Sequence, residues 1–61
     1  MRGKELVSLL QKDGWQIVRI KGSHHILKKG NQIEVIPVHD KDLPKGLMES
    51  IIKRTGINRR S

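Results

Sequence analysis

Apolar positions near both ends of the 61-residue chain recur with helical spacing. Residues three and four apart share one face of a helix, so such a stripe predicts a helix packed on a core. The first stripe predicts a helix over residues 3–12 that stops before Gly14. Its apolar members are Leu6, Val7, Leu9 and Leu10. The second stripe predicts a helix that begins near Pro44 and ends near Gly56. Its apolar members are Leu47, Met48, Ile51 and Ile52.

Between these stripes, β-branched residues and two glycine-led turns predict three strands. The first strand begins at Trp15 and ends at Lys21, and the second spans 24–29. Gly22-Ser23 and Gly30-Asn31 have the composition of two-residue hairpin turns. A third strand is expected over 33–38. Because proline has no N–H to donate, Pro37 places the end of that strand at an edge of the sheet.

This order of elements, α-β-β-β-α, predicts an α+β fold. Two amphipathic helices can cover one face of a three-stranded antiparallel sheet and leave the other face open. The double-stranded-RNA-binding domain has the same order. We expect a single domain over residues 1–61, with 58–61 as a frayed basic tail.

If both turns contain two residues, the strand register follows. The expected pairs are Lys21 with His24, Arg19 with Ile26, Ile17 with Lys28, Lys28 with Ile33, and His24 with Pro37. Cross-strand partners share a face. One face should therefore carry Arg19, Lys21, His24, Lys28, Ile17, Ile26, Ile33 and Val35. The other should carry Val18, Ile20, Leu27, Ile36, Val38, His25, Lys29, Gln32 and Glu34. One bulge would change this assignment.

The charge of the chain favours a polyanionic partner. Thirteen Lys and Arg residues against six Asp and Glu give a net charge of +7. A small basic surface attracts nucleic acid above other polyanions, although an acidic protein partner stays an alternative. The chain has no cysteine for disulfides, and no signal peptide or membrane-spanning run is visible. We therefore expect a cytosolic protein. Trp15 is the only aromatic residue and fits a core position, which excludes an aromatic platform for stacking bases.

His24 is the candidate for chemistry, because it shares its expected face with Arg19, Lys21 and Lys28. Cutting RNA requires removal of a proton from the 2′-hydroxyl and delivery of one to the departing 5′-oxygen. Histidine can perform either step near neutral pH, and nearby cations stabilise the charge that builds on the phosphoryl oxygens. No metal ion is required, so no cofactor is expected. The alternative is that His24 is an ordinary residue beside a turn.

The other histidines occupy different positions. His25 should point to the opposite face from His24, because neighbouring strand residues alternate. His39 follows the third strand close to Pro37, the expected partner of His24. It is a candidate second proton carrier, or a loop residue that bonds the backbone. A zinc site of His24, His39 and Asp40 is the weakest alternative, since the spacing matches no familiar ligand pattern.

Several motifs then carry a resemblance to a known family. They are Gly14-Trp15, Lys21-Gly22-Ser23-His24-His25, Ile36-Pro37-Val38-His39, Leu43-Pro44 and a final helix ending near Gly56. In these motifs, over roughly residues 3–57, the chain resembles the HicA family, the YcfA-type mRNA interferase toxins of toxin–antitoxin modules. The resemblance implies a fold like that of the double-stranded-RNA-binding domain, ribosome-independent cleavage of mRNA, and a cognate HicB antitoxin that blocks the active site.

The resemblance also implies which histidine is essential. It is His24, which the Gly22-Ser23 turn positions; in members with an extra turn residue the histidine shifts by one, which leaves His25 open. Arg19, Lys21 and Lys28 are the expected RNA-binding cations. Departures from the family at Leu27 and Lys29-Gly30 bear on RNA sequence preference more than on cleavage. The alternative function is a basic RNA-binding module without catalytic activity.

Overall fold

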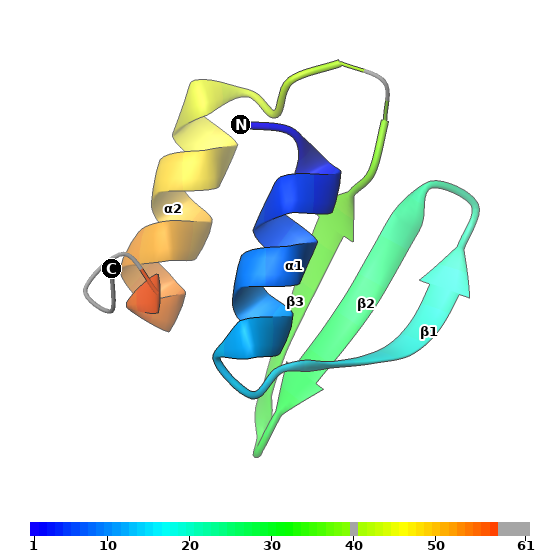
Figure 1. Ribbon diagram of the computed structural model, residues 1–61, viewed down its shortest axis with the longest axis vertical. Coiled ribbons are helices and arrows are strands. Elements are labelled where there is room, and N and C mark those ends of the chain that lie inside the picture. The colour runs from blue at the N-terminus through cyan, green and yellow to red at the C-terminus, as the bar shows by residue number, and fades with distance from the viewer. Residues whose placement is uncertain (40, 58–61) are drawn as a thin grey trace.

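The computed structural model describes residues 1–39 and 41–57, and these follow the predicted order of elements. Helix α1 spans Gly3–Lys12 and helix α2 spans Lys45–Thr55, with strands β1 (Gln16–Lys21), β2 (His24–Lys29) and β3 (Gln32–Pro37) between them. The strands form an antiparallel sheet in the order β1-β2-β3. Both helices lie on one side of this sheet (Figure 1). The predicted α+β fold is confirmed. The expected tail, residues 58–61, lies outside the described residues.

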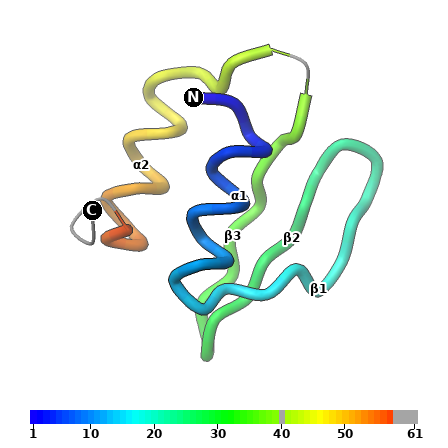
Figure 2. Tube along the Cα trace, viewed as in Figure 1, coloured from blue at the N-terminus to red at the C-terminus, as the bar shows by residue number. Residues whose placement is uncertain are grey.

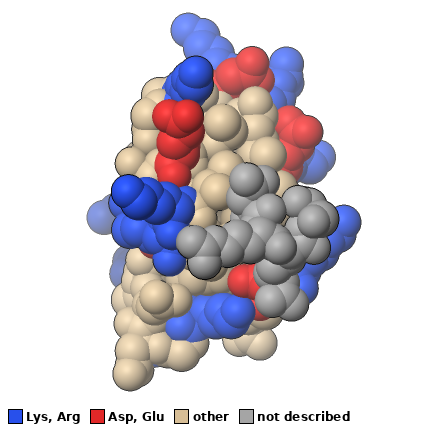
Figure 3. Space-filling model, turned by 90° about the vertical axis from the view of Figure 1, so that its left-hand side faces the viewer, with Lys and Arg blue, Asp and Glu red and all other residues tan. Residues whose placement is uncertain are grey.

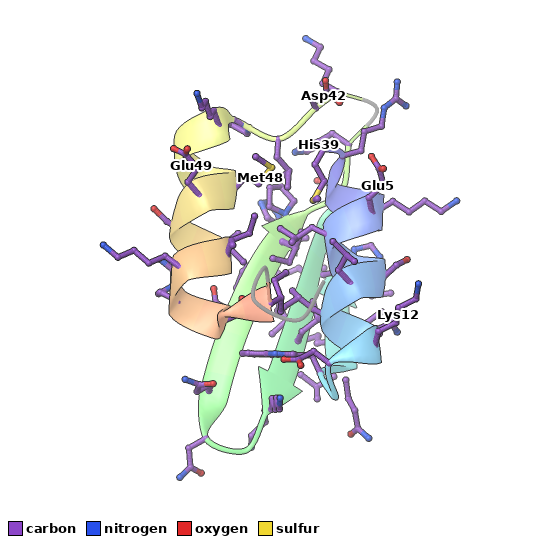
Figure 4. All side chains as sticks on the ribbon, turned by 60° about the vertical axis from the view of Figure 1, so that its left-hand side comes forward. Glu5, Lys12, His39, Asp42, Met48 and Glu49 are labelled. Atoms are coloured by element: carbon purple, nitrogen blue, oxygen red, sulfur yellow. The ribbon has the colours of Figure 1, made fainter. Side chains whose placement is uncertain are left out.

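The apolar core lies between the helices and the covered side of the sheet. Its fully buried side chains are Leu6, Leu10, Leu27, Ile36 and Ile51. Trp15 is also buried, as the sequence predicts, at the junction of α1 and β1. In Figure 4, Met48 lies toward the core, whereas Glu5, Lys12 and Glu49 point to solvent. Neither described helix has the length and apolar character needed to cross a bilayer.

Glycine ends α2 as the sequence predicts. Gly56 adopts a left-handed conformation, with φ of 71°, and its N–H donates to the carbonyl of Ile52 at 2.7 Å. This geometry satisfies a carbonyl at the end of the helix and reverses the chain. The next residue, Ile57, is thereby returned to the core, where it is buried.

A β-bulge in β1 corrects part of the predicted register. The pairs of Lys21 with His24 and Arg19 with Ile26 are confirmed, but the register shifts between Ile17 and Arg19. Ile17 therefore pairs with Leu27, not with Lys28, and packs against the core. The prediction that Ile17 shares the face of His24 is wrong, because the extra residue of a bulge reverses the side on which preceding residues point.

Two ion pairs explain how charged residues are accommodated on the covered face. Lys29 Nζ lies 3.1 Å from Asp13 Oδ2, next to the end of α1. Glu34 is buried on β3 and accepts two hydrogen bonds from Arg54 of α2, at 3.0 and 2.9 Å. These hydrogen bonds and the negative charge of Glu34 raise the pKa of Arg54. The bidentate pair fixes α2 against β3, because it satisfies a carboxylate that would otherwise be buried alone.

The β1–β2 hairpin extends beyond the helices, as the chain trace shows (Figure 2). Ile20 pairs with His25 on the side of the sheet that the helices cover, yet its side chain is 57% exposed. Val18, at the bulge, is 55% exposed. The prediction that Ile20 shares a face with Leu27 and Ile36 is confirmed by its pair with His25, whereas Val18 has no partner in the register that would test its face. Both side chains are exposed because the helices do not reach this end of the hairpin.

The first residue of α1 touches the end of β3. A Cβ atom built on Gly3 would overlap the carbonyl oxygen of Pro37 and would lie 3.1 Å from the Cα of Val38. Gly3 is buried, and only a residue without a side chain fits here. Around this contact, the Leu43 N–H donates to the Met1 carbonyl at 3.0 Å, which joins the N-terminus to the segment before α2.

We expect Gly3→Ala to destabilise the fold, because its methyl group must displace the backbone at the end of β3. Overpacking of this kind costs about 1–3 kcal/mol of unfolding free energy. Gly46→Ala is the matched control, since Gly46 lies in the first turn of α2 with no atom within 4 Å of an added Cβ. The control should be neutral or stabilising by up to about 1 kcal/mol. Urea denaturation of both variants measures the difference, and equal stabilities would contradict the close contact.

Candidate functional site

The uncovered side of the sheet is a regular grid of nine residues, called here the open face. Three cross-strand rows form it: Lys21, His24 and Pro37; Arg19, Ile26 and Val35; Gln16, Lys28 and Ile33. On β2 and β3, neighbouring rows are two residues apart and so lie about 6.8 Å apart. His24 thus occupies the end row beside Lys21, with Arg19 in the next row and Lys28 in the third. The structure places these four predicted residues on one surface.

The open face combines charge with exposed aliphatic groups. It carries three cations and no acidic residue. Ile33 and Val35 are 59% and 46% exposed on it. By contrast, the face seen over the α2 side of the molecule carries basic and acidic side chains mixed together (Figure 3). A surface with only positive charge beside apolar groups suits a flexible polyanion with apolar parts, such as a single strand of nucleic acid.

The β1–β2 turn and the end of β3 together position His24. Gly22 has φ of 59°, a value that L side chains rarely adopt, and it begins the tight turn that ends at His24. Across the sheet, the Val38 N–H donates to the Ser23 carbonyl at 2.6 Å. Hydrogen-bonded and non-hydrogen-bonded pairs alternate in antiparallel sheets. The neighbouring pair, His24 with Pro37, is therefore non-hydrogen-bonded, which is where a proline fits without loss of a bond.

His39 lies close to His24, as its position after Pro37 predicts. The ring centroids of the two histidines are 6.4 Å apart, and the ring planes are inclined at 80°. Both side chains are exposed. Figure 4 shows His39 beyond the end of β3, in the segment that leads to Asp42 and α2. Two imidazoles from different segments thus flank one end of the open face.

His25 is separated from this pair. It lies on the side of the sheet that carries Ile36, its partner across β2 and β3, and is half-buried there. Its Nδ1 atom is buried with no hydrogen-bond partner among the described residues. The prediction that His24 and His25 point to opposite faces is confirmed. His25 is therefore poorly placed to act on a phosphate bound at His24.

The described residues contain no group of three or more His, Asp and Glu side chains that could hold a metal ion. Of the zinc ligands considered from the sequence, His24 and His39 are close together. Asp40 lies outside the described residues.

Sequence reasoning missed two features that support the site. Gly3 was treated only as the start of a helix, although it contacts the strand end that faces His24. The Glu34–Arg54 pair was missed because its members are 20 residues apart in the chain. A carboxylate in the middle of an apolar strand was the available signal, since a buried charge requires a partner.

Comparison with known protein families gave a match over nearly the whole chain. The sequence model of the family described as HicA toxin of bacterial toxin-antitoxin matches residues 3–57. The match includes all five helices and strands. A search of curated proteins gave no match.

The two hairpin glycines provide a test of how the turn positions His24. Gly22 and Gly30 have φ of 59° and 61°, and neither has an atom within 4 Å of an added Cβ. Replacing either with alanine should therefore cost the same left-handed backbone strain, roughly 1–2 kcal/mol of unfolding free energy. Only Gly22→Ala should change the NMR shifts of the His24 and His39 ring protons. Equal changes at these rings in Gly30→Ala would show that the first turn has no special role.

Proposed function

The chain belongs to the HicA toxin family and is the toxin of a toxin–antitoxin system, and from this premise we propose that it acts by cutting mRNA with His24. The reaction is endonucleolytic, independent of the ribosome and independent of metal ions. The observation that carries the proposal is the position of His24 on a cationic open face that has no carboxylate.

The open face suits each requirement of RNA cleavage. The exposed imidazole of His24 can reach a phosphodiester that lies over the first row of the grid. Lys21 and Arg19, in the same row and the next, can stabilise the negative charge that develops on the phosphoryl oxygens. The 2′-hydroxyl supplies the nucleophile, so the substrate must be RNA and not DNA. Proton transfer by a positioned histidine contributes typically about 10²–10⁴-fold to the rate.

The rest of the open face would bind the strand on either side of the cut. Arg19, Lys21 and Lys28 provide contacts to successive phosphates, and such contacts determine affinity without reading sequence. The exposed side chains of Ile33 and Val35 offer apolar area on which bases or riboses can pack. This surface favours unpaired mRNA, whose bases are free to turn toward the protein.

The family implies an antitoxin partner, and we propose a HicB-type protein that covers the open face. Masking Arg19, Lys21 and His24 would prevent both RNA binding and cleavage. An acidic or polar antitoxin surface would also neutralise the cations, while Ile33 and Val35 would be buried on binding. The antitoxin and RNA would then compete for the same residues.

We expect His24→Ala to reduce the rate of mRNA cleavage by about 10²–10⁴-fold, while its affinity for RNA stays nearly unchanged. Purified wild-type protein should cut mRNA in the presence of EDTA, which primer extension or gel analysis measures. His25→Ala is the matched control, because it removes the adjacent histidine from the opposite side of the sheet, and it should retain cleavage.

Induction of the same three proteins in a bacterial host extends this test. Growth arrest with loss of mRNA is expected for the wild type and His25→Ala, but not for His24→Ala. Cleavage by well-purified His24→Ala protein would exclude the proposed role of His24. RNA binding without cleavage by the folded wild type would instead indicate a non-catalytic RNA-binding module.

Removal of a positive charge from the open face should weaken the binding of both RNA and the antitoxin. Lys28→Ala removes one phosphate contact, so the log–log slope of RNA affinity against salt should flatten by about 0.7. The same variant should bind the antitoxin less tightly. Lys53→Ala is the control, because Lys53 is an exposed residue of α2, and it should change neither affinity. If both variants weakened RNA binding equally, the binding surface would not be the open face.

A further inference from the structure

The pair formed by His24 and His39 is the feature from which more can be inferred. The two rings come from different segments, the start of β2 and the connection after β3, and meet with centroids 6.4 Å apart. Both are exposed, so solvent and a bound substrate can reach them. Among the described residues, the side-chain hydrogen bonds include none between the two rings.

The two rings are close enough together to serve one bound group. A proton donor or acceptor must come within about 2.6–3.2 Å of the atom it serves. The two rings form an edge-to-face pair, so they lie side by side, whereas rings much farther apart could not reach the same phosphate. At 6.4 Å, the nitrogens of both imidazoles can contact oxygens of one phosphodiester.

The backbone holds this spacing independently of the two side chains. Pro37 lies opposite His24, the Val38 N–H donates to the Ser23 carbonyl, and Pro37 packs on Gly3. Ser23 and Val38, the residues directly before the two histidines, are therefore held together by a main-chain hydrogen bond. An arrangement maintained in this way is preorganised, which is what transfer of two protons in one reaction requires.

We propose that His24 and His39 act as a two-histidine acid–base pair on the scissile phosphate of RNA. This inference rests on the proposed nuclease function and adds a second catalytic residue to it. One imidazole accepts the proton of the 2′-hydroxyl as the 2′-oxygen forms its bond to phosphorus. The other, as imidazolium, gives a proton to the 5′-oxygen as the bond from phosphorus to that oxygen breaks.

The products follow from this balance. The upstream fragment ends in a 2′,3′-cyclic phosphate and the downstream fragment begins with a 5′-hydroxyl. One histidine finishes protonated and the other neutral, and exchange with water restores the starting states. Phosphorus does not change its oxidation state, and the two imidazoles supply both proton transfers.

A substrate with sulfur in place of the departing 5′-oxygen tests the pair. A thiolate leaves without being protonated, so a variant that lacks only the proton donor should regain its rate on this substrate. The experiment compares wild type, His24→Ala, His39→Ala and the control His25→Ala on matched oxygen and sulfur oligonucleotides. Circular dichroism verifies that each variant is folded.

On the oxygen substrate, His24→Ala and His39→Ala should each be slower by about 10²–10⁴-fold, and His25→Ala should equal wild type. On the sulfur substrate, one of the two slow variants should approach the wild-type rate while the other stays slow. The rescued residue is the proton donor and the other is the base.

Other results would contradict the proposal that His24 and His39 act as an acid–base pair. His39→Ala that cuts the oxygen substrate at the wild-type rate would show that His39 has no part in the chemistry. Rescue of both slow variants, or of neither, would show that the two residues do not divide the proton transfers. An inactive wild type on both substrates would overturn the nuclease function itself, which distinguishes that failure from failure of the pair.

Discussion

The backbone contact between Gly3 and Pro37 is the constraint on which the candidate site depends. It joins the first residue of α1 to the last residue of β3, and it leaves no space for a side chain. Pro37 also faces His24 across the sheet, and the next residue donates a hydrogen bond to Ser23. Helix α1, the β1–β2 turn and the segment that carries His39 therefore meet at one point. Displacement of any one of them would change the distance between the two histidines.

Local features of the backbone and a few ion pairs give the sheet two chemically different faces. The bulge at Val18 turns Ile17 into the core while Arg19 and Lys21 stay on the open face. Without it, one apolar residue would be lost from a small core, or the cations would point at the helices. The pairs of Glu34 with Arg54 and Lys29 with Asp13 then satisfy the charges that remain on the covered face. A domain of this size buries little apolar surface, so the bulge and the two ion pairs each matter to its stability.

In the proposed function, a very small protein binds and cuts RNA with a single surface. The helices and the core occupy one side of the sheet, and the other side is free for RNA or for the antitoxin. Function on such a surface requires exposed apolar residues and unpaired cations, both of which reduce the stability or solubility of an isolated domain. An antitoxin that covers the open face would remove both, so inhibition and stabilisation of the toxin would have the same physical origin.

The sequence determined the elements, their order and the side of the sheet on which His24 lies. Helical stripes, two glycine turns and a proline are local signals, and turns of two residues fix the pairing close to them. The pairing of Lys21 with His24 and of His24 with Pro37 was therefore predictable. Tertiary structure decided the rest. The bulge at Val18 arises because Ile17 is needed in the core, and no local signal specifies it. The closeness of His39 to His24 followed from the pairing of Pro37, but their 6.4 Å spacing did not. The ion pair between Glu34 and Arg54 and the contact of Gly3 with Pro37 join residues distant in sequence. Such contacts depend on how the helices settle on the sheet, which is a property of the packed chain as a whole.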